Sequence, residues 1–460
     1  MAADYGPTIL LELNELCPPI LERMMARGEL PNFRTLHAKS DVYVTHTDDE
    51  SLEPWVQWVT LHTGQVQSVH GAQELDEGHL IDTTRFWDKL ADQGLSSLIF
   101  GSMNGDTSRS DQVFLFPDPW SAGVKATDPN FQALHNFIGH QVREHTNPDA
   151  KPGLADMAKV GAFLASHGLS LKTVTSIVAQ LTSEKTNRAD QHWRRAIILD
   201  LLLWDIFEAT YKKRRPDFAT FFANSTAFLQ HRYWRHMEPE AYQVKPSEQD
   251  LETYGGAIEE SYRHMDGIVG RAIKLAGPNG RIIFATALSQ EANLRYEHIG
   301  GKFVYRPTDF NRLFDWAGAP VATSFEPVMT HQTWASYDSE AEAIAAEAAL
   351  DRITSNGKTI MEWQRDGNRV MFWSGLISQV EDGFELTQSE TGERIAFSEL
   401  FMSLGQVNNS QHHRDGCFWL PPAKGAPKVH SEKLALEDAT ELITSTVLQG
   451  RNTSAETIAA

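Results

Sequence analysis

Carboxylate and amide side chains gather where the first predicted strand ends. The apolar run Thr8–Leu13 is typical of a buried strand, and the period of two places Glu12 and Asn14 on the same side of the chain. Glu15 follows directly at the strand end. A carboxylate in such a place can bind a metal ion or act as a general base, and asparagine can coordinate through its carbonyl oxygen without bringing charge. The alternative for Glu12 is a buried ion pair.

A second pair of reactive side chains opens a predicted helix. Residues Ser51 to His62 are typical of a helix that Gly64 terminates, with Ser51 at its N-cap and Glu53 in its first turn. The helix dipole stabilises a carboxylate there, so Glu53 could act as a metal ligand or general base, and Ser51 as a nucleophile. Both residue types also cap helices without any chemistry, and both interpretations stay open.

The composition excludes several classes of function. The 460 residues carry a formal net charge of −20, which disfavours partners with a phosphate backbone or an anionic lipid surface. We therefore expect no nucleic-acid and no membrane partner. Cys17 and Cys417 lie too far apart to form a thiolate metal site or a disulfide framework, and no apolar run is long enough for a membrane helix. These features predict a soluble, cytoplasmic protein, and they leave its oligomeric state open.

Alternating strands and helices predict an α/β fold with a mostly parallel sheet that helices cover on both faces. The rhythm is interrupted twice, by a helix-rich stretch and by a short stretch of alternating segments. We therefore divide the chain into a first part of the α/β core (1–104), a helical cap insertion (105–215), a second part of the core (216–320), a small α+β insertion (321–395), and the end of the core with a C-terminal helix (396–460).

Several phrases, in order, resemble the type I phosphodiesterase branch of the alkaline phosphatase superfamily. They are the strand ILLELNEL followed by LPNFRTL, the segment SLEPWVQWVTLHTGQVQSVHG, the phrase AFLQHRYWRHMEP, and His412 with Gly416 four residues later. The resemblance spans about three-quarters of the chain and implies an alkaline-phosphatase-like fold. It also implies a site in which two divalent metals activate a nucleophile at the carboxyl ends of the strands.

The resemblance carries only part of that metal site over. Of the family's ligands, His231 and His412 are kept, and both belong to one metal; the opening aspartate falls on Asn14, for which Glu12 or Glu15 could substitute. Other ligand positions fall on Ala227, Ala287 and Leu288. We therefore expect at most one divalent metal, zinc or manganese, or none, with His231, His412, Asn14 and Glu12 as ligands, and we expect the two histidine rings to approach each other closely.

The family's nucleophile position falls on Pro54, which has no nucleophilic group, so Glu53 and Ser51 are the candidate catalytic residues. Gln290, Glu291 and His413 are expected around the same cavity, where they would contact substrate. The resemblance implies a hydrolase or transferase acting on a phospho- or sulfo-ester, with an anionic small molecule or a glycan as substrate. One alternative is a catalytically silent relative that binds an anionic ligand, a glycan or a partner protein. Another is a new reaction on this scaffold.

Overall fold

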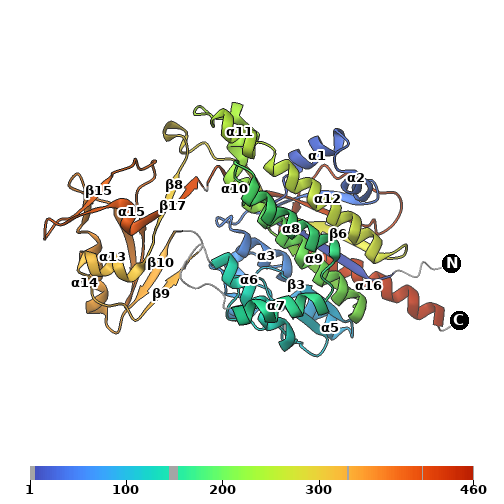
Figure 1. Cartoon of the computed structure of the whole chain (residues 1–460). Helices are drawn as coiled ribbons and strands as arrows, with labels where there is room; N and C mark the ends of the chain where they lie inside the picture. Colours follow the sequence, from blue (N-terminus) through green and yellow to red (C-terminus); the bar gives the residue numbers. More distant parts are fainter. Residues whose placement is uncertain (1–5, 144–153, 329–330, 407, 459–460) are drawn as a thin grey trace.

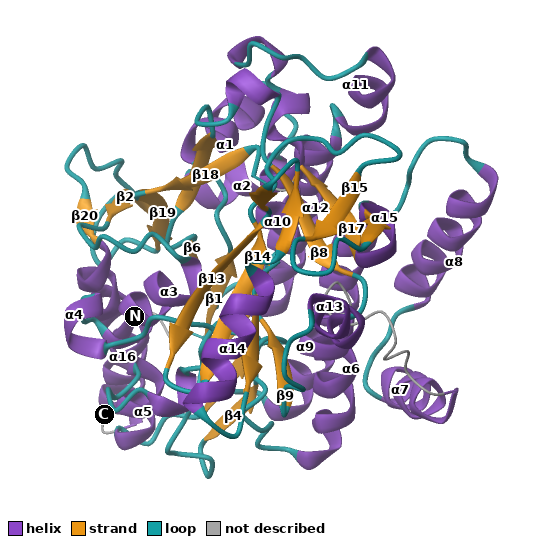
Figure 2. Ribbon diagram, turned by 90° about the vertical axis from the view of Figure 1, so that its left-hand side faces the viewer, coloured by secondary structure: helices purple, strands orange, loops and turns teal. Residues whose placement is uncertain are grey.

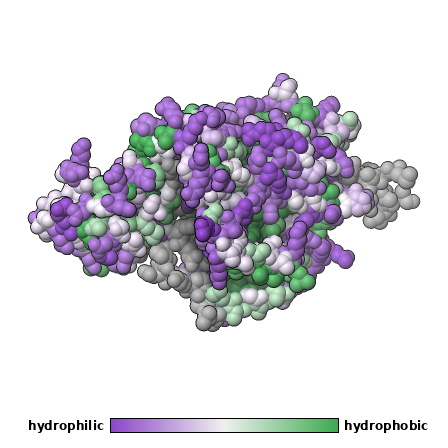
Figure 3. Space-filling model, turned by 45° about the horizontal axis from the view of Figure 1, so that its top comes forward, coloured by the Kyte–Doolittle hydropathy of each residue, from purple (hydrophilic) through white to green (hydrophobic). Residues whose placement is uncertain are grey.

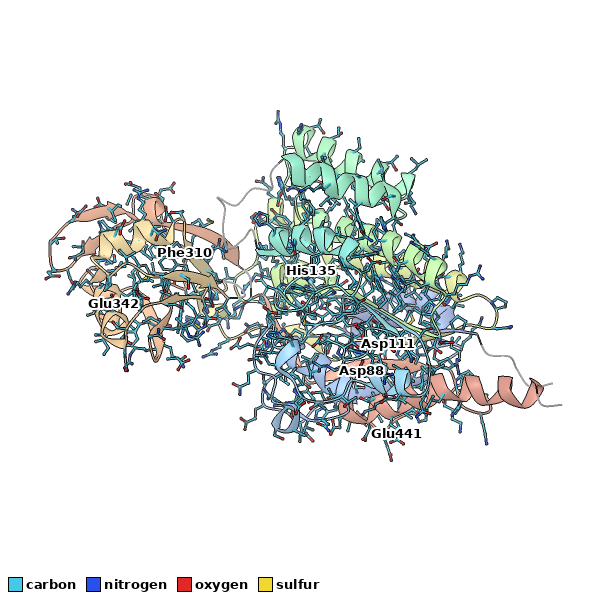
Figure 4. The ribbon with its side chains drawn as sticks, turned by 90° about the horizontal axis from the view of Figure 1, so that it is seen from below. Asp88, Asp111, His135, Phe310, Glu342 and Glu441 are labelled. Atoms are coloured by element: carbon cyan, nitrogen blue, oxygen red, sulfur yellow. The ribbon has the colours of Figure 1, made fainter. Side chains whose placement is uncertain are left out.

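The chain folds into a large α/β core and a smaller unit beside it (Figure 1). The computed structural model describes residues 6–143, 154–328, 331–406 and 408–458. Phe310 and Glu342 lie in the smaller unit, apart from His135, Asp88 and Glu441 of the core (Figure 4). Among the described residues, no helix is long and apolar enough to cross a membrane. Cys17 and Cys417 are both free and buried.

The core is built on one eight-stranded sheet in which only β19 runs against its neighbours. The fold class predicted from the sequence, a mostly parallel sheet between helices, is therefore confirmed. The strands, in spatial order, are β20 (Leu434–Ala435), β2 (Asp41–His46), β19 (Asp415–Leu420), β6 (Arg281–Ala285), β1 (Thr8–Leu13), β5 (Phe218–Ala223), β3 (Ser97–Phe100) and β4 (Val113–Phe116).

Successive side chains of the central strand β1 point to opposite faces of the sheet and belong to two separate apolar cores. Ile9, Leu11 and Leu13 belong to one apolar cluster, whereas Leu10 belongs to another on the opposite face of the sheet. The first face is covered mainly by α1 (Pro18–Ala26), α2 (Pro31–His37), α9 (Arg194–Arg214), α10 (Ser225–Met237) and α12 (Ala257–Ala276), and the second by α3 (Pro54–Thr63), α5 (Phe86–Asp92) and α16 (Ala439–Ile458). The short helices α4 (Gln67–His70) and α11 (Glu248–Tyr254) lie at the margins.

Helices dominate the stretch between β4 and β5. They are α6 (Gln132–Arg143), α7 (Leu154–Ser166), α8 (Leu171–Thr186) and the long α9. The stretch predicted as a cap, 105–215, also contains β4, which forms the edge of the main sheet. That strand was missed because VFLF is too short and too evenly apolar to show a period.

The smaller unit has its own apolar core and begins earlier than the predicted 321–395. A two-stranded ribbon of β8 (Phe303–Pro307) and β17 (Phe401–Gln406) leads into it, and a second ribbon of β7 (Ser289–Ala292) and β18 (Ser410–His413) precedes it at the core (Figure 2). The unit's other elements are β9 (Ser324–Pro327), β10 (Thr333–Ser336), β11 (Ile353–Ser355), β12 (Lys358–Thr359), β13 (Met361–Asp366), β14 (Arg369–Ser374), β15 (Glu385–Gln388), β16 (Arg394–Ala396), α13 (Phe310–Ala317), α14 (Glu340–Leu350) and α15 (Phe397–Leu400).

A buried polar pair joins β1 to α3 beneath the carboxyl edge of the sheet. Glu12 Oε1 lies 3.0 Å from His62 Nε2, and both side chains are almost completely inaccessible. The other polar side-chain atom of each residue, Glu12 Oε2 and His62 Nδ1, has no hydrogen-bond partner. The pair therefore depends on a single contact, and either group alone would be a polar group buried without compensation.

We expect His62→Leu to destabilise the fold by about 3–5 kcal/mol, because it leaves the buried Glu12 carboxylate without its partner. The double variant Glu12→Met/His62→Leu replaces the pair by apolar side chains and should recover much of that loss. Thermal unfolding of the single and double variants measures the coupling. A double variant no more stable than His62→Leu would mean that the two groups do not stabilise each other.

Candidate metal centre

Three side chains from three separate parts of the chain converge at the carboxyl edge of the sheet. Glu15, His231 and His412 each offer a ligand atom, and these atoms all lie within 4.8 Å of one another. Glu15 Oε2 lies 3.4 Å from His231 Nε2 and 3.6 Å from His412 Nε2. The two rings meet edge to face, with centroids 5.0 Å apart. His231 and His412, 181 positions apart, thus approach each other as the resemblance implies.

The end of β1 aims the Glu15 carboxylate into this cluster. The strand stops at Leu13, and Glu15 takes a left-handed backbone conformation with φ of 61°, which costs a residue with a side chain some energy. The side-chain amide of Asn14 donates to Glu15 Oε1 at 2.9 Å, and the Gln290 amide donates to Glu15 Oε2. These hydrogen bonds hold a carboxylate that is only 1% exposed.

One histidine lies on a helix and the other on a two-stranded ribbon. Because α10 follows β5 directly, His231 stands above the carboxyl end of the strand next to β1. His412 is the direct cross-strand neighbour of Gln290 in the β7–β18 ribbon, so both side chains emerge on the same face. Asn409 N donates to the His231 carbonyl oxygen at 2.8 Å, which ties the ribbon to α10.

Charge and burial act against each other in this cluster. Burial would raise the pKa of Glu15, but the charges of His412 and His231 and hydrogen bonds from His231 and Gln290 lower it to about 2. Burial lowers the pKa of His412 to about 4, with His231 acting in the same direction and Glu15 opposing it. These two pKa shifts compete. A charged His412 would favour the Glu15 anion, whereas the lowered pKa of His412 favours a neutral ring. Burial is the larger effect on His412, so we assign a neutral ring beside an ionised carboxylate.

These residues fit a single divalent metal ion. His412 Nε2 is buried, points at Glu15, and has no hydrogen-bond partner. The other ring nitrogen, Nδ1, lies toward Glu53, and the ring also interacts with the backbone of Leu52. A buried ring nitrogen without a partner is the kind of group that a metal satisfies. Ligand atoms about 3.3 Å apart suit tetrahedral coordination with bonds near 2.0–2.1 Å, which is close to the two separations measured from Glu15. Two imidazoles and one carboxylate leave a coordination position open, as in catalytic zinc sites.

Two of the expected ligands lie outside the cluster. Glu12 is engaged below the sheet edge with His62, as in the ion-pair alternative. The carbonyl oxygen of Asn14 accepts the indole N–H of Trp58 at 2.7 Å, so this oxygen is already occupied and the residue instead positions Glu15. The alternation of β1 places Glu12 and Asn14 on one side as expected, but the turn after the strand makes Glu15 the residue that reaches the histidines.

The predicted substrate residues also divide between two faces. Gln290 is buried, and its amide donates to Glu15 and to the Ala227 carbonyl oxygen at 3.3 Å, so it supports the ligand rather than facing open space. Glu291 lies on the other face of the ribbon and accepts from the Gln411 amide at 2.8 Å. His413 is also on that face, where its Nδ1 accepts from the backbone N–H of Asp415.

The start of α3 brings Glu53 to the edge of the cluster. The helix begins at Pro54, which suits a first helical position, so the expected N-cap at Ser51 is wrong. Glu53 occupies the N-cap position without making a side-chain cap, and its Oε2 lies 3.6 Å from His412 Nδ1. Burial, reinforced by the charge of Glu15, raises the pKa of Glu53 to about 7.

A ring of polar residues behind Glu15 was not identified from the sequence. The Gln230 amide donates to the Glu15 carbonyl oxygen at 2.9 Å, and Gln230 Oε1 accepts from the Tyr262 hydroxyl at 2.8 Å. The Tyr262 hydroxyl in turn accepts from the Cys17 backbone N–H at 2.7 Å. The only sequence signal for Gln230 was that it directly precedes His231. The contact with Tyr262 could not be predicted, because it requires the packing of α12 against α10.

No known protein-family profile matches this sequence, and no curated protein matches it. Solved structures do match its backbone. They include phosphonoacetate hydrolase from Sinorhizobium meliloti (11% identity, TM-score 0.43, 96% of each chain covered) and the murine ectonucleotide pyrophosphatase/phosphodiesterase 5 (10% identity, TM-score 0.39, 96% of this chain and 95% of that chain). The human form of the latter matches with 8% identity, a TM-score of 0.39 and the same coverage.

The likeness to these structures is distant, and it assigns no ligand and no activity to any side chain of this chain. The assignments below rest on the geometry of Glu15, His231 and His412 and on the motifs of the sequence.

We expect the chain to bind one equivalent of zinc or manganese and His412→Ala to lose it, because the variant removes the buried nitrogen that lacks a partner. His413→Ala is the matched control, since the adjacent ring lies on the other face of the ribbon. Metal content after dialysis, determined by elemental analysis, should fall in the first variant and stay unchanged in the second. An equal loss in both variants would exclude His412 as a specific ligand.

Proposed function

We propose that this chain is a metal-dependent hydrolase of phosphoester-type bonds in small anionic molecules, with a site for a single metal. The observation that supports this most directly is the convergence of Glu15, His231 and His412 at the carboxyl edge of a mostly parallel sheet, where open α/β sheets place their ligands. The ordered motifs that resemble the type I phosphodiesterases support the choice of reaction class. Transfer to an acceptor other than water, or cleavage of a sulfo-ester, would use the same arrangement.

Glu15, His231 and His412 would hold the metal, and Asn14 and Gln290 would keep the Glu15 carboxylate oriented toward it. When bound, the metal would supply Lewis-acid stabilisation of the charge on the phosphoryl oxygens and an acidified water molecule. Ala287 and Leu288 are buried apolar residues at the positions where the resemblance implies an Asp-His pair of metal ligands, and the loss of that pair removes ligands for a second metal. The described residues contain no further cluster of this kind, which favours a mononuclear site.

Glu53 is the residue that we assign to proton transfer. Pro54 excludes a covalent intermediate at the family's nucleophile position, so the attacking group is water or a neighbouring side chain, and we assign water. The Glu53 carboxylate is 41% exposed and lies beside His412 on the side away from Glu15. It is therefore free of the metal ligand set and open to solvent, which is the placement that a general base for water requires.

Ser51 is a second candidate for the attacking group. It is half-buried and sits two residues before Glu53, and its backbone carbonyl oxygen accepts from the Gln57 amide at 2.9 Å. That contact fixes the loop that leads into α3 and leaves the Ser51 hydroxyl uninvolved. If Ser51 were the nucleophile, Glu53 would act as its base.

We expect Glu53→Gln to lower turnover of a chromogenic phosphodiester by about 10²–10⁴-fold, because the variant removes a general base while keeping the shape of the side chain. Metal content should remain, and the melting temperature should change little, since the side chain is partly exposed. Ser51→Ala should retain turnover if water attacks. Kinetics with zinc or manganese added, alongside elemental analysis, separates these cases.

Two results would contradict the assignment. Full activity in Glu53→Gln would remove its catalytic role, and full loss in Ser51→Ala with Glu53 intact would make the serine the nucleophile. A metal-loaded protein that turns over no phosphodiester, phosphomonoester, phosphonate or sulfate ester would favour the silent, ligand-binding alternative.

A further inference from the structure

Helix α8 carries its apolar side chains on the outside. The structure places α8 at the periphery of the molecule (Figure 2) and packs it on α9. Its buried positions are polar, namely Thr173 and Gln180. Four of its exposed side chains form an apolar row, with exposed fractions of 84% for Leu171, 36% for Val174, 57% for Val178 and 49% for Leu181. We call these four residues the α8 stripe.

Polar contacts fix this orientation of the helix. The Ser170 side chain caps α8 by accepting from Thr173 N at 3.1 Å, and Ser170 N donates to Asp205 on α9 at 2.9 Å. At the other end, Glu184 pairs with Arg195 at 2.6 Å. The helix is therefore anchored at both ends by its polar face.

The space beneath α8 would not accept the stripe. A cavity of about 420 Å³ lies there, lined on the α8 side by Lys172, Thr173 and Ser176 and on the opposite side by basic residues of α12, among them Arg263, Arg271 and Lys274. Turning the helix would press leucine and valine side chains against these charged groups and remove water from them. The outward stripe is thus the lower-energy arrangement of the single chain, and it leaves apolar surface to be covered.

The stripe has the spacing of a helix–helix seam and is symmetric about its own centre. The intervals of three, four and three residues are those of adjacent a and d positions in a heptad. Leu171 and Leu181 lie five positions on either side of residue 176, and Val174 and Val178 lie two positions on either side of it. Two copies of α8 packed antiparallel about a two-fold axis would therefore place leucine against leucine across the ends, and valine against valine at the centre.

We infer that the α8 stripe is a self-association surface, and that its partner is a second copy of this chain packed antiparallel. A two-fold interface uses the same patch on both subunits and must match itself, which the symmetric stripe does. An unrelated partner would not require that symmetry. Antiparallel packing also sets the positive end of one helix dipole beside the negative end of the other.

The charge distribution fits this contact. The chain has a net charge of −20, so two copies repel each other overall. The face of the molecule in Figure 3 is predominantly hydrophilic. Between Lys172 and Glu184, however, α8 contains no charged residue. The helix therefore offers a neutral surface at which two acidic molecules can meet, and added salt should strengthen the contact by screening the remaining repulsion.

The size of the stripe indicates a weak dimer. Stable interfaces bury about 800 Å² on each partner, more than four partly exposed aliphatic side chains provide. We therefore expect association in the micromolar range, visible as a dependence on protein concentration. The metal site lies elsewhere on the molecule, so this inference stands independently of the proposed activity.

Sedimentation velocity of the full chain over a wide concentration range tests the inference. The unmodified protein should shift from monomer to dimer as its concentration rises, and more readily at higher salt. Val178→Glu places a charge in the stripe and should abolish the shift. Ala179→Glu adds the same charge at the next residue, exposed but turned away from the stripe, and should leave the shift unchanged. A monomer at every concentration, or an equal response of the two variants, would overturn the inference.

Cysteine cross-linking tests the antiparallel arrangement. Both native cysteines are buried, so an introduced surface cysteine would be the accessible thiol. A mixture of Val174→Cys and Val178→Cys copies should form a disulfide-linked dimer under mild oxidation in higher yield than either variant alone. Preferential cross-linking of Val174→Cys with itself would indicate parallel packing and contradict the proposed arrangement.

Discussion

The buried carboxylate of Glu15 must be compensated by polar groups, and the surrounding elements are arranged to supply them. It is almost fully buried at the end of the central strand, where an ionised group without partners would cost several kcal/mol. The fold compensates it with amide donors from Asn14 and Gln290 and with the ring of His231, and His412 Nε2 faces it without a hydrogen-bond partner. Each of these groups comes from a different segment, so holding one charge ties four parts of the chain together.

This requirement explains the local departures from regular structure. Glu15 adopts a left-handed backbone conformation, and so does Ala287, two residues after the end of the neighbouring strand β6. Such conformations cost energy and persist where the surroundings fix them. The ribbon of β7 and β18 follows, and its cross-strand pairing places Gln290 and His412 side by side. The polar groups behind Glu15, Gln230 and Tyr262, keep the turn rigid.

The chain thus combines one candidate metal-binding group, Glu15 with His231 and His412, with apolar residues at other positions where the resemblance implies ligands. Ala227, Ala287 and Leu288 pack in the interior, and their side chains offer no ligand atoms. A single metal provides less charge to neutralise a phosphoryl group than two would, which makes the contribution of Glu53 more important in any reaction at this site. The Glu53 side chain, 41% exposed beside the buried cluster, is accessible to water.

The outline of the fold was accessible from the sequence because it depends on local patterns. Thr8–Leu13, Phe218–Ala223 and the strand that begins at Arg281 are evenly apolar runs bounded by turns, and parallel strands buried on both faces have that composition. The histidines at 231 and 412 could be named from ordered motifs. The strand at Val113–Phe116 could not be recognised, because four apolar residues show no period.

Tertiary structure alone decided which polar side chains share a site. Alternation along β1 places Glu12 and Asn14 on the same side of the strand. In the structure, however, Glu12 pairs with His62, and the Asn14 side-chain oxygen accepts a hydrogen bond from Trp58. Likewise, Gln290 and Glu291 are adjacent in sequence, and only the register of β7 against β18 determines which one turns toward Glu15. Sequence encodes the residue types and the period of each element. The choice of partner across hundreds of positions is made when the elements pack, because a buried charge is stable only where its compensating groups meet it.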